Sequence, residues 1–104
     1  MSHDDPVASR QVEIINEYGL HLRPADKFVR LAHQYQSEIL VIYQGTQFNG
    51  KSILDLTSLA AECGTQIELV ARGADAQAAV DALADLISAR FHEPEEGSDK
   101  DAAS

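Results

Sequence analysis

A histidine and an arginine two positions apart, His21 and Arg23, are the residues whose types and spacing best suit chemistry. They lie just before Pro24, which a helix tolerates only near its start because the missing N–H costs nothing there. The first amides of a helix have no intrahelical acceptor, so those of Leu22 and Arg23 could bind an anion. That end of a helix also disfavours an imidazolium, so a neutral His21 could attack a phosphoryl group whose oxygens the guanidinium binds. On spacing alone, an ordinary helix cap is the competing interpretation.

Ser52 is the second candidate, because Ser52 and Asp55 have the spacing of a capping box. In that motif the hydroxyl accepts a hydrogen bond from a first-turn N–H, and the acid three positions later reaches back to the cap. The motif predicts a short helix that ends at about Glu62, before Cys63 and Gly64. A capping serine stabilises a helix without any further role, so a purely structural interpretation stays open for these residues.

The elements that must position these residues follow from apolar spacing and turn signals. Helical periodicity predicts one helix from about His21 to Tyr35 and another, capped by Asp75, that continues to Phe91. Alternating or β-branched segments predict four strands, at residues 11–16, 38–43, 46–49 and 65–71. With the short helix after Ser52, the order of elements is βαββαβα.

The hairpin formed by residues 38–43 and 46–49 decides between two architectures. Alternating strands and helices could build a doubly wound parallel sheet, but a tight hairpin joins antiparallel strands. The chain is also small. The expected fold is therefore α+β, with an antiparallel sheet covered by helices on one face.

The 104 residues carry a net charge of −9, which argues against nonspecific binding to nucleic acid or to an anionic membrane surface. No apolar run approaches the roughly 20 residues that span a bilayer, and the N-terminus lacks the basic and apolar regions of a signal peptide. We therefore expect a cytoplasmic protein without membrane insertion. Since no apolar stripe is left without a core to pack on, we expect a monomer.

Much of the negative charge lies at the two ends of the chain. Residues 93–104 carry five acids and one lysine, a net charge of −4, and we expect them to be a disordered acidic tail. Residues 1–10 carry −1 and show no periodicity, so we expect a flexible leader. The folded domain would then span residues 11–92 and carry the remaining −4.

The other polar candidates indicate neither a metal site nor a nucleotide cofactor. His3, His33 and His92 lack metal-ligand spacing with one another or with Cys63. A single cysteine permits no internal disulfide. Because the sequence has no glycine-rich phosphate loop, the phosphoryl donor is expected to be a protein rather than ATP.

Two segments resemble the HPr family, the histidine phosphocarriers of the bacterial phosphoenolpyruvate:sugar phosphotransferase system. Residues 19–25, GLHLRPA, followed by Phe28 and Val29, are similar to the active-site signature of that family. Residues 49–54, NGKSIL, are similar to its regulatory-serine segment, and residues 71–75, ARGAD, fit the remainder in order. The resemblance covers roughly residues 11–91.

The resemblance implies an open-faced β-sandwich, in which three helices lie on one face of a four-stranded antiparallel sheet. It implies that phosphorylated enzyme I places a phosphoryl group on Nδ1 of His21, that Arg23 contacts this group, and that a histidine of enzyme IIA receives it. The chain would then be a carrier in a phosphotransfer relay rather than an enzyme. The resemblance also makes Ser52 a target of HPr kinase/phosphorylase, whose action would hinder transfer to His21.

The resemblance further implies a docking surface for enzyme I and enzyme IIA. Its apolar residues would come from the active-site loop and the short helix, namely Leu22, Ile53 and Leu54. Four of the six Lys and Arg residues of the domain lie in the same two segments, which favours electrostatic steering of an acidic partner. These cations are Arg23, Lys27, Arg30 and Lys51.

Two acids depart from the pattern of the family. Asp26 places negative charge in the first turn of the active-site helix, near the incoming phosphate. Asp55 would lie near any phosphate on Ser52. We expect the first to weaken transfer and the second to weaken regulation.

Two other functions stay open on the sequence. One is a regulatory paralogue in catabolite or nitrogen-related signalling, which would bind partner proteins without serving a sugar permease. The other is an unrelated small α/β binding module in which the motif is accidental. The presence of His21 favours a working phosphoryl relay.

Overall fold

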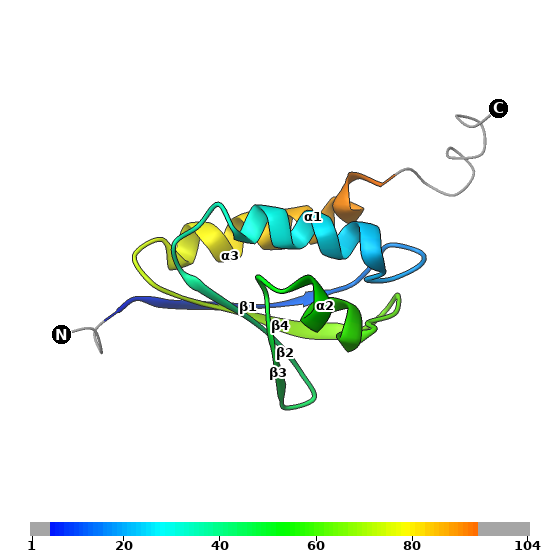
Figure 1. Ribbon diagram of the computed structural model, residues 1–104, viewed down its shortest axis with the longest axis horizontal. Coiled ribbons are helices and arrows are strands. Elements are labelled where there is room, and N and C mark those ends of the chain that lie inside the picture. Colours follow the sequence, from blue (N-terminus) through cyan, green and yellow to red (C-terminus); the bar gives the residue numbers. More distant parts are fainter. Residues whose placement is uncertain (1–4, 94–104) are drawn as a thin grey trace.

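The structure, a computed structural model that describes residues 5–93, places four strands in one antiparallel sheet of order β1-β4-β2-β3. Helices α1 and α3 lie side by side over one face of this sheet, and α2 packs against α1 and β3 (Figure 1). The elements are β1 (Val7–Glu13), α1 (Leu22–Ala32), β2 (Glu38–Tyr43), β3 (Thr46–Asn49), α2 (Ile53–Leu59), β4 (Gln66–Arg72), α3 (Ala76–Ser88) and the 3₁₀ turn η2 (Arg90–His92). The α+β open-faced sandwich expected from the sequence is confirmed.

The core lies between the helical layer and the covered face of the sheet. In the central strand β4 the side chains of Ile67, Leu69 and Ala71 are buried and alternate with more exposed neighbours, as the period of two requires. The helices contribute side chains at intervals of three and four, such as Phe28 of α1 and Leu83 of α3. No helix among residues 5–93 is long and apolar enough to cross a membrane.

The first strand begins earlier than predicted. The segment 11–16 was expected to pair, but β1 covers Val7–Glu13, so residues 7–10 belong to the sheet and not to a leader. Each of these residues has a partner on β4, and within 7–10 only Ala8 is buried. Backbone pairing with β4 therefore extends the strand to residues 7–10, and this pairing leaves no apolar pattern in the sequence. The acidic segment 93–104 lies outside the described residues, apart from Glu93.

Three helix ends also differ from expectation. Helix α1 ends at Ala32, before Tyr35, and α2 ends at Leu59 because Ala60 adopts a left-handed conformation with φ of 55°. The stop expected at Cys63 and Gly64 was wrong. Helix α3 ends at Ser88, yet Phe91 is fully buried, because the turn η2 directs its ring back into the core.

Asp75 ties two loops together instead of capping α3 through its side chain. Its carboxylate accepts hydrogen bonds from the N–H of Gln36 at 2.8 Å, from the N–H of Ser37 at 2.9 Å and from the Ser37 hydroxyl. The predicted side-chain cap is absent. The Ser37 hydroxyl, followed by the Gln36 amide, lowers the pKa of this carboxyl below its ordinary value.

We predict that Asp75→Asn lowers the melting temperature at pH 7, because an amide cannot accept all three hydrogen bonds. A carboxyl whose pKa is lower in the folded state stabilises the fold above its unfolded pKa of about 4, and this contribution is lost as the pH falls through the folded value. Thermal unfolding followed by circular dichroism should therefore show a gap between wild type and variant that narrows below pH 4. A gap that stays constant from pH 7 to pH 2 would contradict this role of Asp75.

Candidate functional site

His21 occupies the N-cap of α1, with its side chain exposed to solvent. Its ring makes no capping hydrogen bond, and its carbonyl accepts the first helical hydrogen bond from the N–H of Ala25 at 2.9 Å. Pro24 has no N–H, so Leu22 and Arg23 carry the two N–H groups that the helix leaves without an intrahelical acceptor. An anion bonded to the imidazole would lie next to these two donors.

The loop that leads into His21 is held by a backbone hydrogen bond to the segment that follows α2. The N–H of Leu20 donates to the carbonyl of Ala61 at 2.7 Å, and Leu20 itself is buried. Gly19 adopts a φ of +72°, and a side chain there would meet the Ala61 carbonyl oxygen at 2.3 Å. This close approach, which only glycine allows, places the peptide before His21 against the turn that follows α2.

Asn16 also holds this loop, although it belongs to neither of the two motifs that marked His21 and Ser52. This residue is only 6% exposed, its side-chain Nδ2 donates to the carbonyl of Gly19 at 2.6 Å, and its backbone carbonyl accepts from the N–H of Gly19 at 3.0 Å. An asparagine three positions before a glycine, after the first strand, is a turn signal that could have revealed it. We assign Asn16 a positioning role.

A shallow hollow opens beside the imidazole. Its lining includes Tyr18, His21 and Thr57, together with Glu62 from the turn after α2. The rings of Tyr18 and His21 meet edge to face, with centroids 6.4 Å apart. Because the hollow is open on its outer side, the His21 ring is accessible to another macromolecule.

A second groove, on the other side of the helix start, contains Arg23. It is lined by Leu22, Arg23, Asp26, Lys27 and Ile53. Leu22 is 63% exposed and Leu54 on the neighbouring helix is 75% exposed, which is unusual for apolar side chains of this size. Of the predicted docking residues, Leu22, Lys27 and Ile53 thus meet at this groove. Arg30 lies in the last turn of α1, and Lys51 bonds to the chain just after that helix, so these two cations lie at its other end.

The four predicted docking cations differ in their contacts within the chain. Lys27 Nζ donates to the carbonyl of Phe91, Lys51 Nζ donates to the carbonyl of Tyr35, and Arg30 pairs with Asp26 at 2.7 Å. Among residues 5–93 no hydrogen bond or ion pair engages the guanidinium of Arg23, which is exposed. Arg23 is therefore the cation most available to an incoming anion.

Ser52 caps α2 as expected, but the capping box is only half formed. The Ser52 hydroxyl accepts from the N–H of Asp55 at 3.2 Å. The Asp55 carboxylate, expected to bind the N–H of Ser52, instead accepts from the N–H of Asn49 at 2.8 Å, while the Ser52 N–H donates to the Asn49 carbonyl. The acid therefore lies beside the serine and fixes the turn that precedes it.

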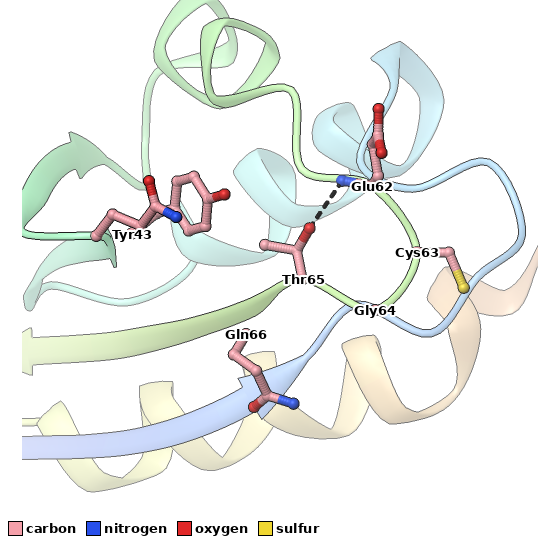
Figure 2. A pocket seen from close by; sticks show the side chains of 7 residues that line it. Tyr43, Glu62, Cys63, Gly64, Thr65 and Gln66 are labelled. Carbon is pink, nitrogen blue, oxygen red and sulfur yellow. Dashed lines mark hydrogen bonds between the residues drawn. The ribbon is translucent and has the colours of Figure 1, made fainter.

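The exposed Cys63 lines another open hollow, together with the rest of the turn before β4 and Tyr43 from the end of β2 (Figure 2). There the N–H of Glu62 donates to the Thr65 hydroxyl at 3.0 Å, which closes the turn that carries Ala61. Within residues 5–93 no group of His, Cys, Asp and Glu side chains is arranged to hold a metal ion. Among the described residues, we therefore take the region of His21 as the candidate site.

Comparisons with known proteins match most of the chain to phosphocarrier proteins. A family profile described as "PTS HPr component phosphorylation site" matches residues 8–89. The chain is 48% identical over 86 residues to the phosphocarrier protein HPr of Neisseria meningitidis serogroup A, which covers 83% of this chain and 97% of that protein. It is 39% identical over 84 residues to the phosphocarrier protein NPr of Shewanella violacea, covering 81% and 92%.

Regulatory relatives and solved structures also match. The HPr-like protein Crh of Bacillus subtilis is 38% identical over 78 residues, covering 75% of this chain and 92% of Crh, and its solution structure is titled a catabolite repression HPr. The crystal structure of HPr-C-His from Thermoanaerobacter tengcongensis superposes with a TM-score of 0.80 at 39% identity, covering 84% and 98%. Another structure from that organism is titled an HPr dimer.

We predict that Gly19→Ala destabilises the fold more than Gly64→Ala does. Both glycines have positive φ, so both substitutions carry the left-handed penalty of about 1–2 kcal/mol. A side chain at Gly64 meets nothing within 4 Å, whereas one at Gly19 collides with Ala61, which adds at least about 1 kcal/mol of steric cost. Urea unfolding measures both losses, and equal losses would show that the close approach to Ala61 is not required.

Proposed function

This chain belongs to the HPr family of phosphocarrier proteins, and we propose that it accepts a phosphoryl group on Nδ1 of His21 from phosphorylated enzyme I and passes it to a histidine of enzyme IIA. One observation carries the proposal. The exposed imidazole of His21 stands at the N-terminus of α1, where the N–H groups of Leu22 and Arg23 precede the first helical hydrogen bond.

The chemistry needs little from this chain beyond position. The imidazole nitrogen attacks phosphorus, the bond between phosphorus and the donor breaks, and the phosphoryl oxygens meet the two N–H groups and the Arg23 guanidinium. In the second step the same group leaves His21 for the histidine of enzyme IIA. Because the partner completes the site and excludes water, alignment of the two proteins supplies most of the catalysis.

The surface around His21 suits such a partner. Leu22 and Leu54 are exposed apolar side chains that a docked protein would bury, and Ile53 lines the same groove as Leu22. Arg23 lies beside these side chains and is available to phosphate or to an acidic partner. Asp26, expected to oppose the phosphate, pairs with Arg30, and this pairing offsets part of its negative charge.

We expect phosphoryl transfer from enzyme I and phosphoenolpyruvate to label His21 alone. The label should be acid-labile and stable in alkali, should be lost in His21→Ala, and should persist in the matched control His33→Ala. His33 suits this purpose because it is an exposed histidine at the opposite end of α1, where its ring contacts the carbonyl of Lys51. Absence of label with any cognate enzyme I, or a label that survives His21→Ala, would refute the carrier function.

A second candidate function is regulation through phosphorylation of Ser52, favoured by the match to Crh and by the position of this serine at a helix N-cap. A phosphate there would meet first-turn amides of α2 and would add about −1.5 to −2 charges close to the docking residues Ile53 and Leu54. Such a charge would repel the acidic partner that Arg23 attracts. In this alternative the chain binds partner proteins without serving a sugar permease.

Asp55 should weaken the modification of Ser52, because its carboxylate lies in the first turn that the phosphate would enter. We predict that HPr kinase/phosphorylase modifies the Asp55→Asn variant roughly two- to fivefold faster than the wild type. The variant lacks one negative charge that repels the incoming phosphate at the protein surface. The amide keeps an acceptor for the Asn49 N–H, so the variant changes the charge and preserves the hydrogen bond. Equal rates for both proteins would remove Asp55 from the regulation of Ser52.

A further inference from the structure

We propose that the acidic residues after Glu93 bind the groove beside His21 and compete there with the acidic partner. The groove is the one lined by Leu22, Arg23, Asp26, Lys27 and Ile53, so it coincides with the proposed docking surface. The inference rests on the phosphocarrier function above. It adds an occupant of that surface from the chain itself, namely residues 94–104.

The last described residue is already held against the active-site helix. Lys27 Nζ donates to the carbonyl of Phe91 at 2.8 Å and lies 3.1 Å from Oε2 of Glu93, whose side chain is only 14% exposed. Figure 1 shows η2, in orange, beside the N-terminal half of α1. The acidic segment therefore starts at a wall of the groove.

A backbone turn, anchored in the core, directs the chain to this position. Arg90, Phe91 and His92 all have φ near +57°, and the Phe91 ring between them is fully buried. Without this turn, the chain would continue along the axis of α3. Because the core anchors Phe91, the fold holds Glu93 beside Lys27, and the acidic segment begins there.

The length of the segment is sufficient to reach the site. From Lys27 back to Leu22 the helix rises about 7.5 Å, at 1.5 Å for each of five residues. Random-coil statistics give any eleven residues a root-mean-square span of about 18 Å. The carboxylates of the segment can thus reach Arg23 and the first amides of α1 without straining the anchor at Glu93.

The charges of groove and segment are complementary. Within the groove, Glu93 offsets Lys27 and Arg30 offsets Asp26, so the remaining positive groups are Arg23 and the unbonded N–H groups. The segment 94–104 has no aliphatic side chain larger than alanine, which makes the contact electrostatic. Its four acids and one lysine are Glu95, Glu96, Asp99, Asp101 and Lys100.

The contact between the segment and the groove must be weak, because a partner protein has to displace the segment. Tethering gives the segment an effective concentration in the millimolar range, enough to occupy the groove for part of the time. A partner must displace it, so the segment raises KM for phosphorylated enzyme I by roughly two- to fivefold without changing kcat. A phosphoryl group on His21 repels the same carboxylates, so the phosphorylated carrier presents a free groove to enzyme IIA.

The test uses a full-length variant in which the segment is neutral, E95Q/E96Q/D99N/D101N. A control with the same change in net charge, D5N/E13Q/E38Q/D85N, alters exposed acids of the N-terminus, the strands and α3. At low ionic strength, NMR resonances of the Leu22 and Arg23 amides should differ between wild type and the neutral-segment variant but not between wild type and control. In about 1 M salt, where the Debye length is about 3 Å, the difference should vanish.

Kinetics complete the test. The neutral-segment variant should have a KM for phosphorylated enzyme I that is roughly two- to fivefold lower than that of the wild type. The control variant should keep the wild-type KM. Coincident resonances in wild type and the neutral-segment variant, or an equal fall in KM for the control, would overturn the proposal. Shifts that grow with protein concentration would assign the contact to a second copy and would also overturn it. Absence of label on His21 would refute the carrier function, and the resonances would still report whether the segment binds.

Discussion

The position at which α1 begins is the constraint on which the rest of the site depends. The hydrogen bond from the N–H of Leu20 to the carbonyl of Ala61 fixes the backbone one residue before His21, and Gly19 permits the approach. Asn16 holds the other side of the same turn. As a result, His21 becomes the N-cap, its ring stays exposed, and the next two residues carry N–H groups without an intrahelical acceptor. The sheet and the two long helices keep these segments in place.

Much of this arrangement follows from local sequence patterns. The helix start at His21, the hairpin of β2 and β3 and the capping hydroxyl of Ser52 could all be predicted, because each depends on neighbours within a few residues. The roles of Asp75 and Asp55 could not. The Asp55 carboxylate binds the N–H of Asn49, six residues earlier, instead of the cap that its spacing favours. The Asp75 carboxylate binds the N–H groups of Gln36 and Ser37, which become its neighbours only in the folded chain. For the same reason, strand β1 gained residues 7–10 through pairing with β4.

The number of basic residues in the two motif segments does not say how many of them are free to bind an anion. Four basic side chains in two segments of the sequence suggest a steering surface. In the structure, however, Lys27 bonds to the C-terminal turn, Arg30 pairs within α1, and Lys51 bonds to the chain just after α1. Arg23 stands apart because the part of the chain that the structure describes gives its guanidinium no partner. An acidic protein can thus present one accessible positive site, and its own acids can compete for that site.

The central claim is that the start of α1 and Arg23 hold the phosphoryl group on His21. The most direct measurement is a proton–nitrogen NMR spectrum of the protein before and after phosphorylation. A hydrogen bond to a phosphoryl oxygen should move the amide protons of Leu22 and Arg23 and the Nε proton of Arg23 downfield, while the amide of His33 at the far end of the helix stays in place. If the Leu22 and Arg23 protons remained unshifted in fully phosphorylated protein, the helix start would not bind the group, and this account of the site would be contradicted.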